Sequence, residues 1–155
     1  MPVRNEATAL AATPESIAAQ RTLHGAPFDL SRIEVLLLAN NCSDDCAPIA
    51  GAFARANPAL AVHVAEVQLT DACAHIGHVR RLLMDAACAR LEYHGRGGLV
   101  VSTGGDTVVD PRWLASMLQE FDEDLFERFV KRIIVHSRSD IRFELKCGLT
   151  LRERK

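Results

Sequence analysis

Residues 33–45 read IEVLLLANNCSDD, a run of apolar residues that is followed at once by short polar ones. The apolar part, Ile33 to Ala39, has the length of a strand and is nearly continuous, which is typical of a strand covered on both faces in a parallel sheet. The polar part can bond the backbone amides of a following helix, and Asp44 and Asp45 suit the positive end of that helix. The stretch therefore predicts a buried parallel strand that leads through a polar loop into a helix.

Strand-like and helix-like segments alternate on both sides of this stretch. Apolar residues at strand or helical spacing, bounded by proline, glycine and asparagine, predict the further elements. In chain order the predicted elements are a helix over 13–23, the strand over 33–39, a helix that ends at Asn57-Pro58, a strand over 60–69, a helix over 76–91, a strand over 99–101 and a helix after Pro111. This order predicts an α/β fold in which a parallel sheet carries helices on both faces.

Polar residues follow two of the predicted strands directly. Residues 40–45 come after the strand at 33–39, and residues 102–106 come after the short strand at 99–101. Ligands of open parallel sheets sit beyond the carboxyl ends of the strands. We therefore expect the two polar segments to converge on one crevice.

The composition changes near Phe121. Residues 1–120 have no lysine, whereas residues 121–155 have no alanine and contain every lysine of the chain. The later part predicts a helix over 122–131 and strands over 132–136, 141–145 and 149–151. We expect a partial domain over 1–120 and a helix plus β-hairpin tail over 121–155, with compositional drift inside one domain as the alternative.

The overall composition is that of a soluble globular protein, because 48% of the residues are hydrophobic and 25% are charged. No apolar run approaches the roughly 20 residues of a membrane-spanning helix, and the first residues lack the apolar core of a signal peptide. A cytoplasmic location is therefore expected. The net charge of −2 gives no general attraction to nucleic acid, and an odd number of cysteines, five, favours reduced thiols over a disulfide framework.

Four pieces of the sequence resemble, in order and spacing, the N-terminal half of a family 2 glycosyltransferase. They are PVRNE at 2–6, EVLLLANNCSDD at 34–45, HIGHVRR at 75–81, and STGGDT at 102–107 followed by Pro111, Trp113 and Leu114. Enzymes of this family use nucleotide sugars and have a Rossmann-like fold. The resemblance covers about residues 1–120 and implies a truncated Rossmann-like sheet of the glycosyltransferase A type.

The resemblance also implies roles for individual residues. Pro2 and Arg4 match positions beside the nucleotide base, Asn40 stands where the family usually has a base-contacting aspartate, and Arg80 matches a basic residue that faces the nucleotide. Asp106 matches the second carboxylate of the Asp-x-Asp motif, which holds the Mg²⁺ or Mn²⁺ that bridges the sugar diphosphate. A nucleotide-sugar donor and a divalent cation are therefore the implied ligands.

The sequence departs from the family in three places. Gly104 stands where the family has the first aspartate of the metal motif, so metal affinity should fall. The chain begins part way into the first strand, which leaves open sheet edges that invite self-association. Only 42 residues follow Trp113, fewer than the acceptor-binding half with its catalytic base requires. We expect nucleotide-sugar binding or glycosyl transfer that is weak or inactive, and no catalytic residue is assigned.

The tail resembles the C-terminal end of a large serine recombinase. The similar pieces are FDEDLF at 121–126, IIVH at 133–136 and FELKCGLT at 143–150. In that family this region belongs to the DNA-binding part, which implies a DNA-contacting fragment as an alternative function. A net charge of +4 from Arg132 onward is compatible with weak phosphate contact, and equally with a solvated hairpin face. A further alternative is a hybrid or generated chain without selected activity.

Several of the singled-out residues have simpler interpretations. Arg80 and Arg81 can form a solvated helix face, Asp106 can cap a turn, and Trp113 can be core packing rather than a sugar platform. Cys88, on an apolar helix, is expected to be a small buried residue.

Cysteine and histidine residues raise one further possibility. Zinc could in principle be bound by a soft-ligand set drawn from Cys42, Cys46, Cys73, His75 and His78. The spacing matches no recurrent zinc site, and two of these residues are already explained by the glycosyltransferase-like pieces. The zinc interpretation is therefore the lesser alternative.

Overall fold

The computed structural model describes residues 1–95, 97–120, 130–137, 140–146 and 150–154. The chain forms two compact units, Met1–Ala115 and Ser116–Lys155. The composition break lies at Phe121, a few residues beyond this division.

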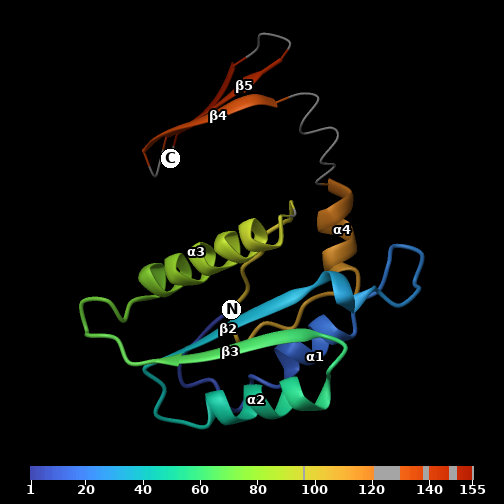
Figure 1. The fold of residues 1–155 in the computed structure, drawn as a ribbon, viewed down its shortest axis with the longest axis vertical. Coiled ribbons are helices and arrows are strands. Elements are labelled where there is room, and N and C mark those ends of the chain that lie inside the picture. Colours follow the sequence, from blue (N-terminus) through green and yellow to red (C-terminus); the bar gives the residue numbers. More distant parts are fainter. Residues whose placement is uncertain (96, 121–129, 138–139, 147–149, 155) are drawn as a thin grey trace. The chain divides into compact units, whose positions relative to one another are not determined.

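The first unit is built on a parallel three-stranded sheet with the order β1-β2-β3 (Figure 1). Its strands are β1 (Pro2–Val3), β2 (Glu34–Asn40) and β3 (Ala61–Val67). The predicted α/β class with a parallel sheet is confirmed. β3 runs along the whole of β2, whereas β1 pairs only with Leu38 and Ala39, near the carboxyl end of β2.

Helices cover both faces of this sheet. The first unit contains α1 (Ala12–Ala18), α2 (Cys46–Ala56) and α3 (Ile76–His94), and α4 (Trp113–Glu120) begins at its end. Figure 1 shows α3 on one side of β2 and β3, with α1 and α2 on the other. The structure therefore confirms three predicted helices, those before Asn57, over 76–91 and after Pro111.

The side of β2 that faces α1 and α2 is closely packed. Leu37 and Ala39 belong to a buried cluster with Val3, Leu10 and the first turns of α2. Val35, at the other end of β2, joins a second cluster to which Trp113 packs. The apolar run that predicted a doubly covered strand thus supplies the main core residues of the unit, and Trp113 belongs to the core.

Two predicted elements differ from the structure. Residues 99–101 do not form a strand, and Leu99 is 40% exposed. They do not pair with β2, although within the described residues no strand covers its β1-side edge from Glu34 to Leu36. The helix predicted over 13–23 ends at Ala18, because the Gln20 side chain donates to the Asp110 carbonyl at 2.7 Å and draws the chain away from the helix.

The second unit contains an antiparallel sheet with the order β4-β5-β6. The strands are β4 (Val130–Ser137), β5 (Asp140–Leu145) and β6 (Thr150–Arg154). The predicted hairpin is therefore part of a three-stranded sheet. The helix predicted over 122–131 is wrong at its last two residues, which belong to β4, and its other residues lie outside the described ranges.

Among the helices of the described residues, none combines the length and the apolar character needed to cross a bilayer.

Candidate functional site

The loop after β2 is held against the end of β3. Asn41 adopts a positive φ of 48°, a conformation that asparagine tolerates better than most residues. Its side chain exchanges two hydrogen bonds with the backbone of Leu69, at 2.8 and 2.9 Å. These bonds fix the point where the polar segment 40–45 leaves the sheet.

Asn40 is a buried polar residue at the carboxyl end of β2. Its side chain is 4% exposed, and its Nδ2 donates to the carbonyl of Ala74 at 3.2 Å. The guanidinium of Arg4 donates to the same carbonyl at 3.3 Å. Oδ1 of Asn40 has no hydrogen-bond partner within the described residues. The two sequence-predicted residues therefore meet at one carbonyl, and one of them keeps an unused acceptor.

The segment around Gly105 lies against the end of β1. A side chain at Gly105 would meet the carboxylate of Glu6 and come within 2.8 Å of Val3, so only glycine fits there. The Gly105 carbonyl accepts a hydrogen bond from the hydroxyl of the buried Thr13 at 2.7 Å. This close approach places the neighbouring Asp106 beside the residues that follow β1.

Glu6 is the carboxylate that the two polar segments share. Burial raises its pKa above the ordinary value, and the nearby charges of Asp106 and Asp44 raise it further. Its Oε2 atom is buried and has no partner within the described residues. The expected convergence of segments 40–45 and 102–106 is thus seen at this side chain. Glu6 belongs to one of the pieces of sequence that resemble the glycosyltransferase family, but the sequence alone predicted no role for it.

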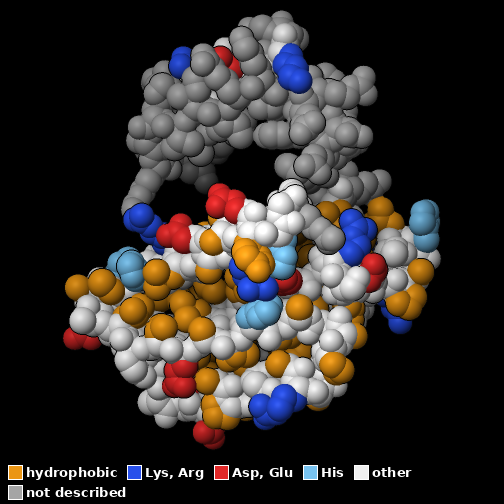
Figure 2. Space-filling model, in the orientation of Figure 1, with side chains coloured by type: hydrophobic (Ala, Val, Ile, Leu, Met, Phe, Trp, Pro, Cys, Tyr) orange, Lys and Arg blue, Asp and Glu red, His pale blue; other side chains and the backbone are white. Residues whose placement is uncertain are grey.

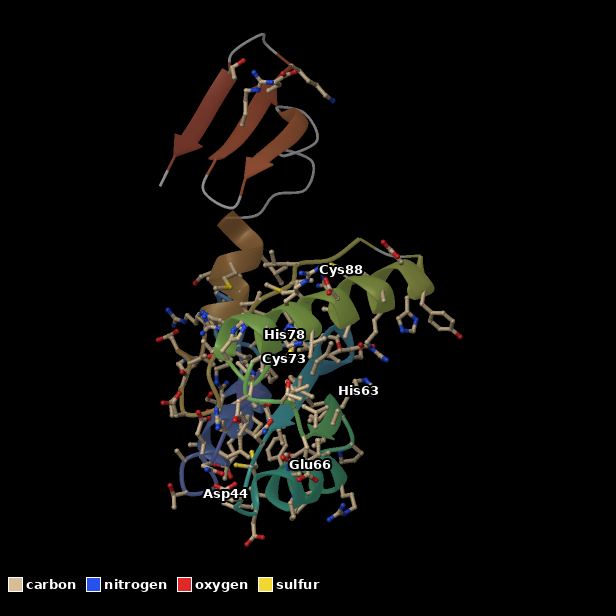
Figure 3. The ribbon with its side chains drawn as sticks, turned by 90° about the vertical axis from the view of Figure 1, so that its left-hand side faces the viewer. Asp44, His63, Glu66, Cys73, His78 and Cys88 are labelled. Carbon is tan, nitrogen blue, oxygen red and sulfur yellow. The ribbon has the colours of Figure 1, made fainter. Side chains whose placement is uncertain are left out.

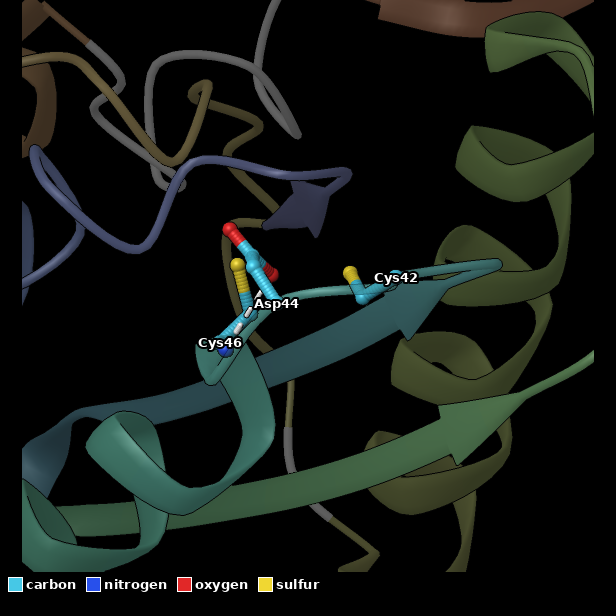
Figure 4. A group of neighbouring side chains, drawn as sticks. All are labelled: Cys42, Asp44 and Cys46. Carbon is cyan, nitrogen blue, oxygen red and sulfur yellow. Dashed lines mark hydrogen bonds between the residues drawn. The ribbon is translucent and has the colours of Figure 1, made fainter.

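Cys42, Asp44 and Cys46 form a compact group at the start of α2 (Figure 4). Their ligand atoms, two sulfurs and a carboxylate oxygen, all lie within 4.8 Å of one another. Burial raises the pKa of the Cys46 thiol to about 12, and Asp44 and Cys42 act in the same direction. The hydrogen bond of Asp44 with the Cys46 side chain, followed by the bond from the Ala7 amide, lowers the pKa of the Asp44 carboxyl.

The larger zinc-ligand set considered from the sequence is not assembled. Asp44, rather than Cys73, His75 or His78, completes the group with the two cysteines. His75 caps α3 by accepting from the His78 amide at 3.2 Å. Figure 3 shows Cys73 and His78 at the start of α3, well separated from Asp44.

Arg80 lies on the α3 side of the sheet. It lines a cavity of about 360 Å³ together with Met1 and Ser102. The amino group of Met1 donates to the Leu36 carbonyl at 2.6 Å, and burial together with Arg80 lowers the pKa of this amino group to about 6. Leu36, Leu83, Met84 and Leu99 also line the cavity, which lies beside the part of β2 that β1 does not reach.

The five residues implied by the resemblance therefore occupy a limited part of the first unit. Pro2 is buried in β1 beside Leu38, and Arg4 and Asn40 meet at Ala74. Asp106 approaches Glu6, and Arg80 faces the cavity. The expectation for Cys88 is wrong, since this residue is exposed on α3, which buries only Val79 completely.

An ion-pair group on the α3 side was not anticipated from the sequence. Arg90 donates to Glu34 at 2.6 Å, and His63 and His94 lie within 4 Å of the same carboxylate. The hydrogen bond from Arg90 lowers the pKa of Glu34. The group joins α3 to the amino-terminal ends of β2 and β3. No local sequence pattern indicates it, because its members are up to 60 positions apart.

No known protein family matches the chain, and no curated protein or solved structure is significantly similar to it.

Proposed function

We propose that the first unit binds a nucleoside diphosphate, the donor part of a nucleotide sugar, at the carboxyl ends of β1 and β2. The observation that carries this proposal is the unpaired Oδ1 of Asn40. A buried acceptor without a partner costs about 1–3 kcal/mol, so a ligand that donates to it gains affinity. Nucleobases carry ring N–H or amino donors of this kind.

Arg4 provides the charge that such a ligand requires. It is exposed, it lies next to Asn40 through their shared contact with Ala74, and its guanidinium can form paired hydrogen bonds with phosphate oxygens. The end of a parallel strand is also the usual place for a nucleotide in an open α/β sheet. Location, charge and an unused acceptor therefore support the same class of ligand.

Carboxylates close to this point support a Mg²⁺ or Mn²⁺ requirement. Besides burial, the charges of Asp106 and Asp44 raise the pKa of Glu6, so both carboxylates lie close to it. A hard divalent cation takes oxygen ligands and would relieve the repulsion of Glu6 by these charges while it bridges the diphosphate. Asp106 is the ligand that the glycosyltransferase resemblance implies, and Gly104 leaves the first position of that motif without a carboxylate.

Binding without efficient transfer is the activity we propose. Deprotonation of an acceptor hydroxyl needs a positioned base, and no residue of this chain is assigned that role. A cation held by fewer carboxylates also stabilises the leaving diphosphate less well. Glycosyl transfer should therefore be weak or absent.

The experiment is calorimetric titration of the full chain with uridine, guanosine and adenosine diphosphates, with and without Mn²⁺. Trp113 fluorescence is a poor reporter, because this side chain packs near Val35 at the opposite end of β2. We expect binding of at least one nucleotide that Mn²⁺ strengthens. Failure of every nucleotide to bind, in the presence of Mn²⁺, both the natural chain and Gly104→Asp would overturn the proposal.

Two variants test the assigned residues. Asn40→Leu removes the unused acceptor and should weaken binding about tenfold, which corresponds to about 1.4 kcal/mol. Asn57→Leu is the matched control, because Asn57 makes the same kind of amide-to-carbonyl bond at the end of α2. Gly104→Asp should strengthen the Mn²⁺ dependence. Its new Cβ would meet the exposed Asp106 carboxylate at 2.7 Å, and that side chain can rotate away.

The second unit gives less support to a DNA-contacting function. Arg142 and Glu144 lie 3.9 Å apart as an ion pair, and Arg132 stands opposite Glu144 in the register of β4 and β5. The described residues from 130 to 154 still include six basic residues against three acidic ones, and this excess is as compatible with a solvated sheet as with phosphate contact.

A further inference from the structure

We propose that Cys42, Asp44 and Cys46 form a binding site for a thiophilic divalent cation, with Zn²⁺ as the physiological candidate. The group offers two sulfur atoms and one carboxylate oxygen within 4.8 Å of one another (Figure 4). Two thiolates and a carboxylate are ligands that Zn²⁺ takes in proteins. The site differs in chemistry from the proposed Mn²⁺ position at Asp106, where the donors are oxygens alone.

The distances between the three ligand atoms are close to those around a bound zinc ion. A tetrahedral zinc with Zn–S bonds of about 2.3 Å holds its ligand atoms about 3.8 Å apart. Ligand atoms that lie within 4.8 Å therefore need to move by only about 1 Å to reach this geometry. Cys42 can make that movement, because it lies on the loop, is partly exposed and has long sulfur contacts to the Val3 and Asn40 carbonyls, at 3.5 and 3.9 Å.

The other two ligands are fixed by backbone hydrogen bonds. Asp44 accepts from the Ala7 amide at 2.9 Å and from the Cys46 amide at 3.3 Å, one bond to each carboxylate oxygen. Cys46 is fully buried in the first turn of α2, and its sulfur accepts from the Glu6 amide at 3.2 Å. Such bonds orient metal ligands before the ion arrives and leave further lone pairs free for it.

A water molecule would complete the four ligands. Glu6 is close enough to Asp44 to sense its charge, and the Oε2 atom of Glu6 is a buried acceptor without a partner within the described residues. A water bound to the cation can donate a hydrogen bond to that oxygen. The arrangement therefore accounts for an acceptor that the protein alone leaves unpaired.

The competing explanation is that Cys46 is simply a small core residue, since it packs with Leu10 and Ala50. That explanation requires nothing of Cys42 or Asp44. A metal site requires all three residues, and this difference decides the experiment.

The test is a Co²⁺ titration of the full chain under reducing conditions, followed by absorption spectroscopy, with Zn²⁺ competition to measure the zinc affinity. Cys147 lies outside the described residues, so every protein tested carries Cys147→Ser. We expect one equivalent of Co²⁺ to give thiolate-to-metal charge-transfer absorption and the visible bands of a tetrahedral ion. Zn²⁺ should abolish both signals.

Three variants assign the signal. Cys42→Ser and Asp44→Asn should each weaken zinc binding more than about tenfold, because the loss of even an outer-sphere partner costs about 10–100-fold. Cys88→Ser, which changes an exposed cysteine on α3, is the matched control and should leave the affinity unchanged. Circular dichroism confirms that each variant is folded.

The proposal is overturned if the Cys147→Ser protein gives no thiolate charge transfer, or if Cys42→Ser retains the signal while Cys88→Ser or Cys73→Ser removes it. Nucleotide titrations keep the two proposals separate. Cys42→Ser should leave Mn²⁺-dependent nucleotide binding intact, and Asn40→Leu should leave the Co²⁺ spectrum intact.

Discussion

The two faces of the parallel sheet are covered by helices to very different degrees. On the α1 and α2 face, Leu37 and Ala39 are at most 2% exposed and pack against equally buried partners. On the α3 face, Leu36 borders the 360 Å³ cavity, and only one of the 19 residues of α3 is fully buried. Neighbouring residues of one strand thus contribute to a close-packed core on one side and to a loosely filled space on the other.

The surface of α3 reflects the same difference. Ile76, Met84 and Tyr93 are exposed on this helix, although the helix was predicted from the spacing of its apolar residues. Hydrophobic side chains can be seen at the surface of the first unit in Figure 2. The comparison teaches that helical spacing shows which residues can face a sheet, while burial depends on whether the sheet extends far enough beneath them.

The largest expected effect comes from shortening the two adjacent leucines of β2. Leu37→Ala should lower the free energy of unfolding by about 2–5 kcal/mol, because it opens a cavity in a packed core. Leu36→Ala should cost about 1–2 kcal/mol, because that side chain already borders empty space and loses fewer contacts. Urea denaturation of the two variants measures the difference. Equal losses would contradict the comparison of the two faces.

A smaller effect of opposite sign is expected when side chains are enlarged on the two faces. Ala50→Leu, in α2, should lower the free energy of unfolding by about 1–3 kcal/mol, because this position is 1% exposed and has no room for more atoms. Ala87→Leu, in α3, should raise it by about 0.5–2 kcal/mol, because the added atoms fill the cavity. Thermal unfolding of the pair gives the sign of each change. Destabilisation by Ala87→Leu would show that the cavity is less accommodating than its volume indicates.

The smallest effect should come from the ion pair that holds α3 to β2. Arg90→Gln should cost about 0.2–1 kcal/mol at neutral pH, because both partners are partly exposed to solvent. Arg90 holds the pKa of Glu34 below its ordinary value, so the contribution is present above about pH 4 and is lost as the pH falls through the lowered pKa. His63 and His94 also face the Glu34 carboxylate, at 3.9 and 3.8 Å.

Denaturation curves of the natural chain and of Arg90→Gln at pH 7 and pH 3 test this effect. The difference between the two proteins should be larger at pH 7 than at pH 3. Arg81→Gln removes a more exposed pair, with Asp85, and should change stability less at either pH. A difference that grows toward acidic pH would contradict the assigned sign.

Local sequence patterns correctly predicted the elements whose boundaries depend on neighbouring residues. The apolar run before Asn40, the proline after Asn57 and the glycine at Gly95 mark boundaries that the structure reproduces to within a few residues. Gly95 ends α3 with a φ of 61°, which is favourable for glycine. These features depend on neighbouring residues, so a sequence pattern is sufficient to recognise them.

Features that depend on distant partners were harder to predict. Residues 99–101 have the composition of a strand but pair with none in the structure. The helix predicted over 13–23 is cut short by bonds from Gln20 and Arg21 to Asp110 and Pro111. At the candidate site, the sequence indicated Asn40 and Asp106, but not that Glu6 lies near Asp106 or that Asp44 joins the two cysteines. Those contacts arise from tertiary folding, and the spacing of residues along the chain does not indicate them.

The brief pairing of β1 with β2 has a consequence for how fast the first unit forms. The bond from Met1 to Leu36 joins residues 35 positions apart, and the ends of that loop must meet before any strand contact stabilises them. The strands of the second unit are joined by short connections and need no comparable search. We therefore expect the antiparallel sheet of the second unit to acquire its order sooner than the parallel sheet of the first unit.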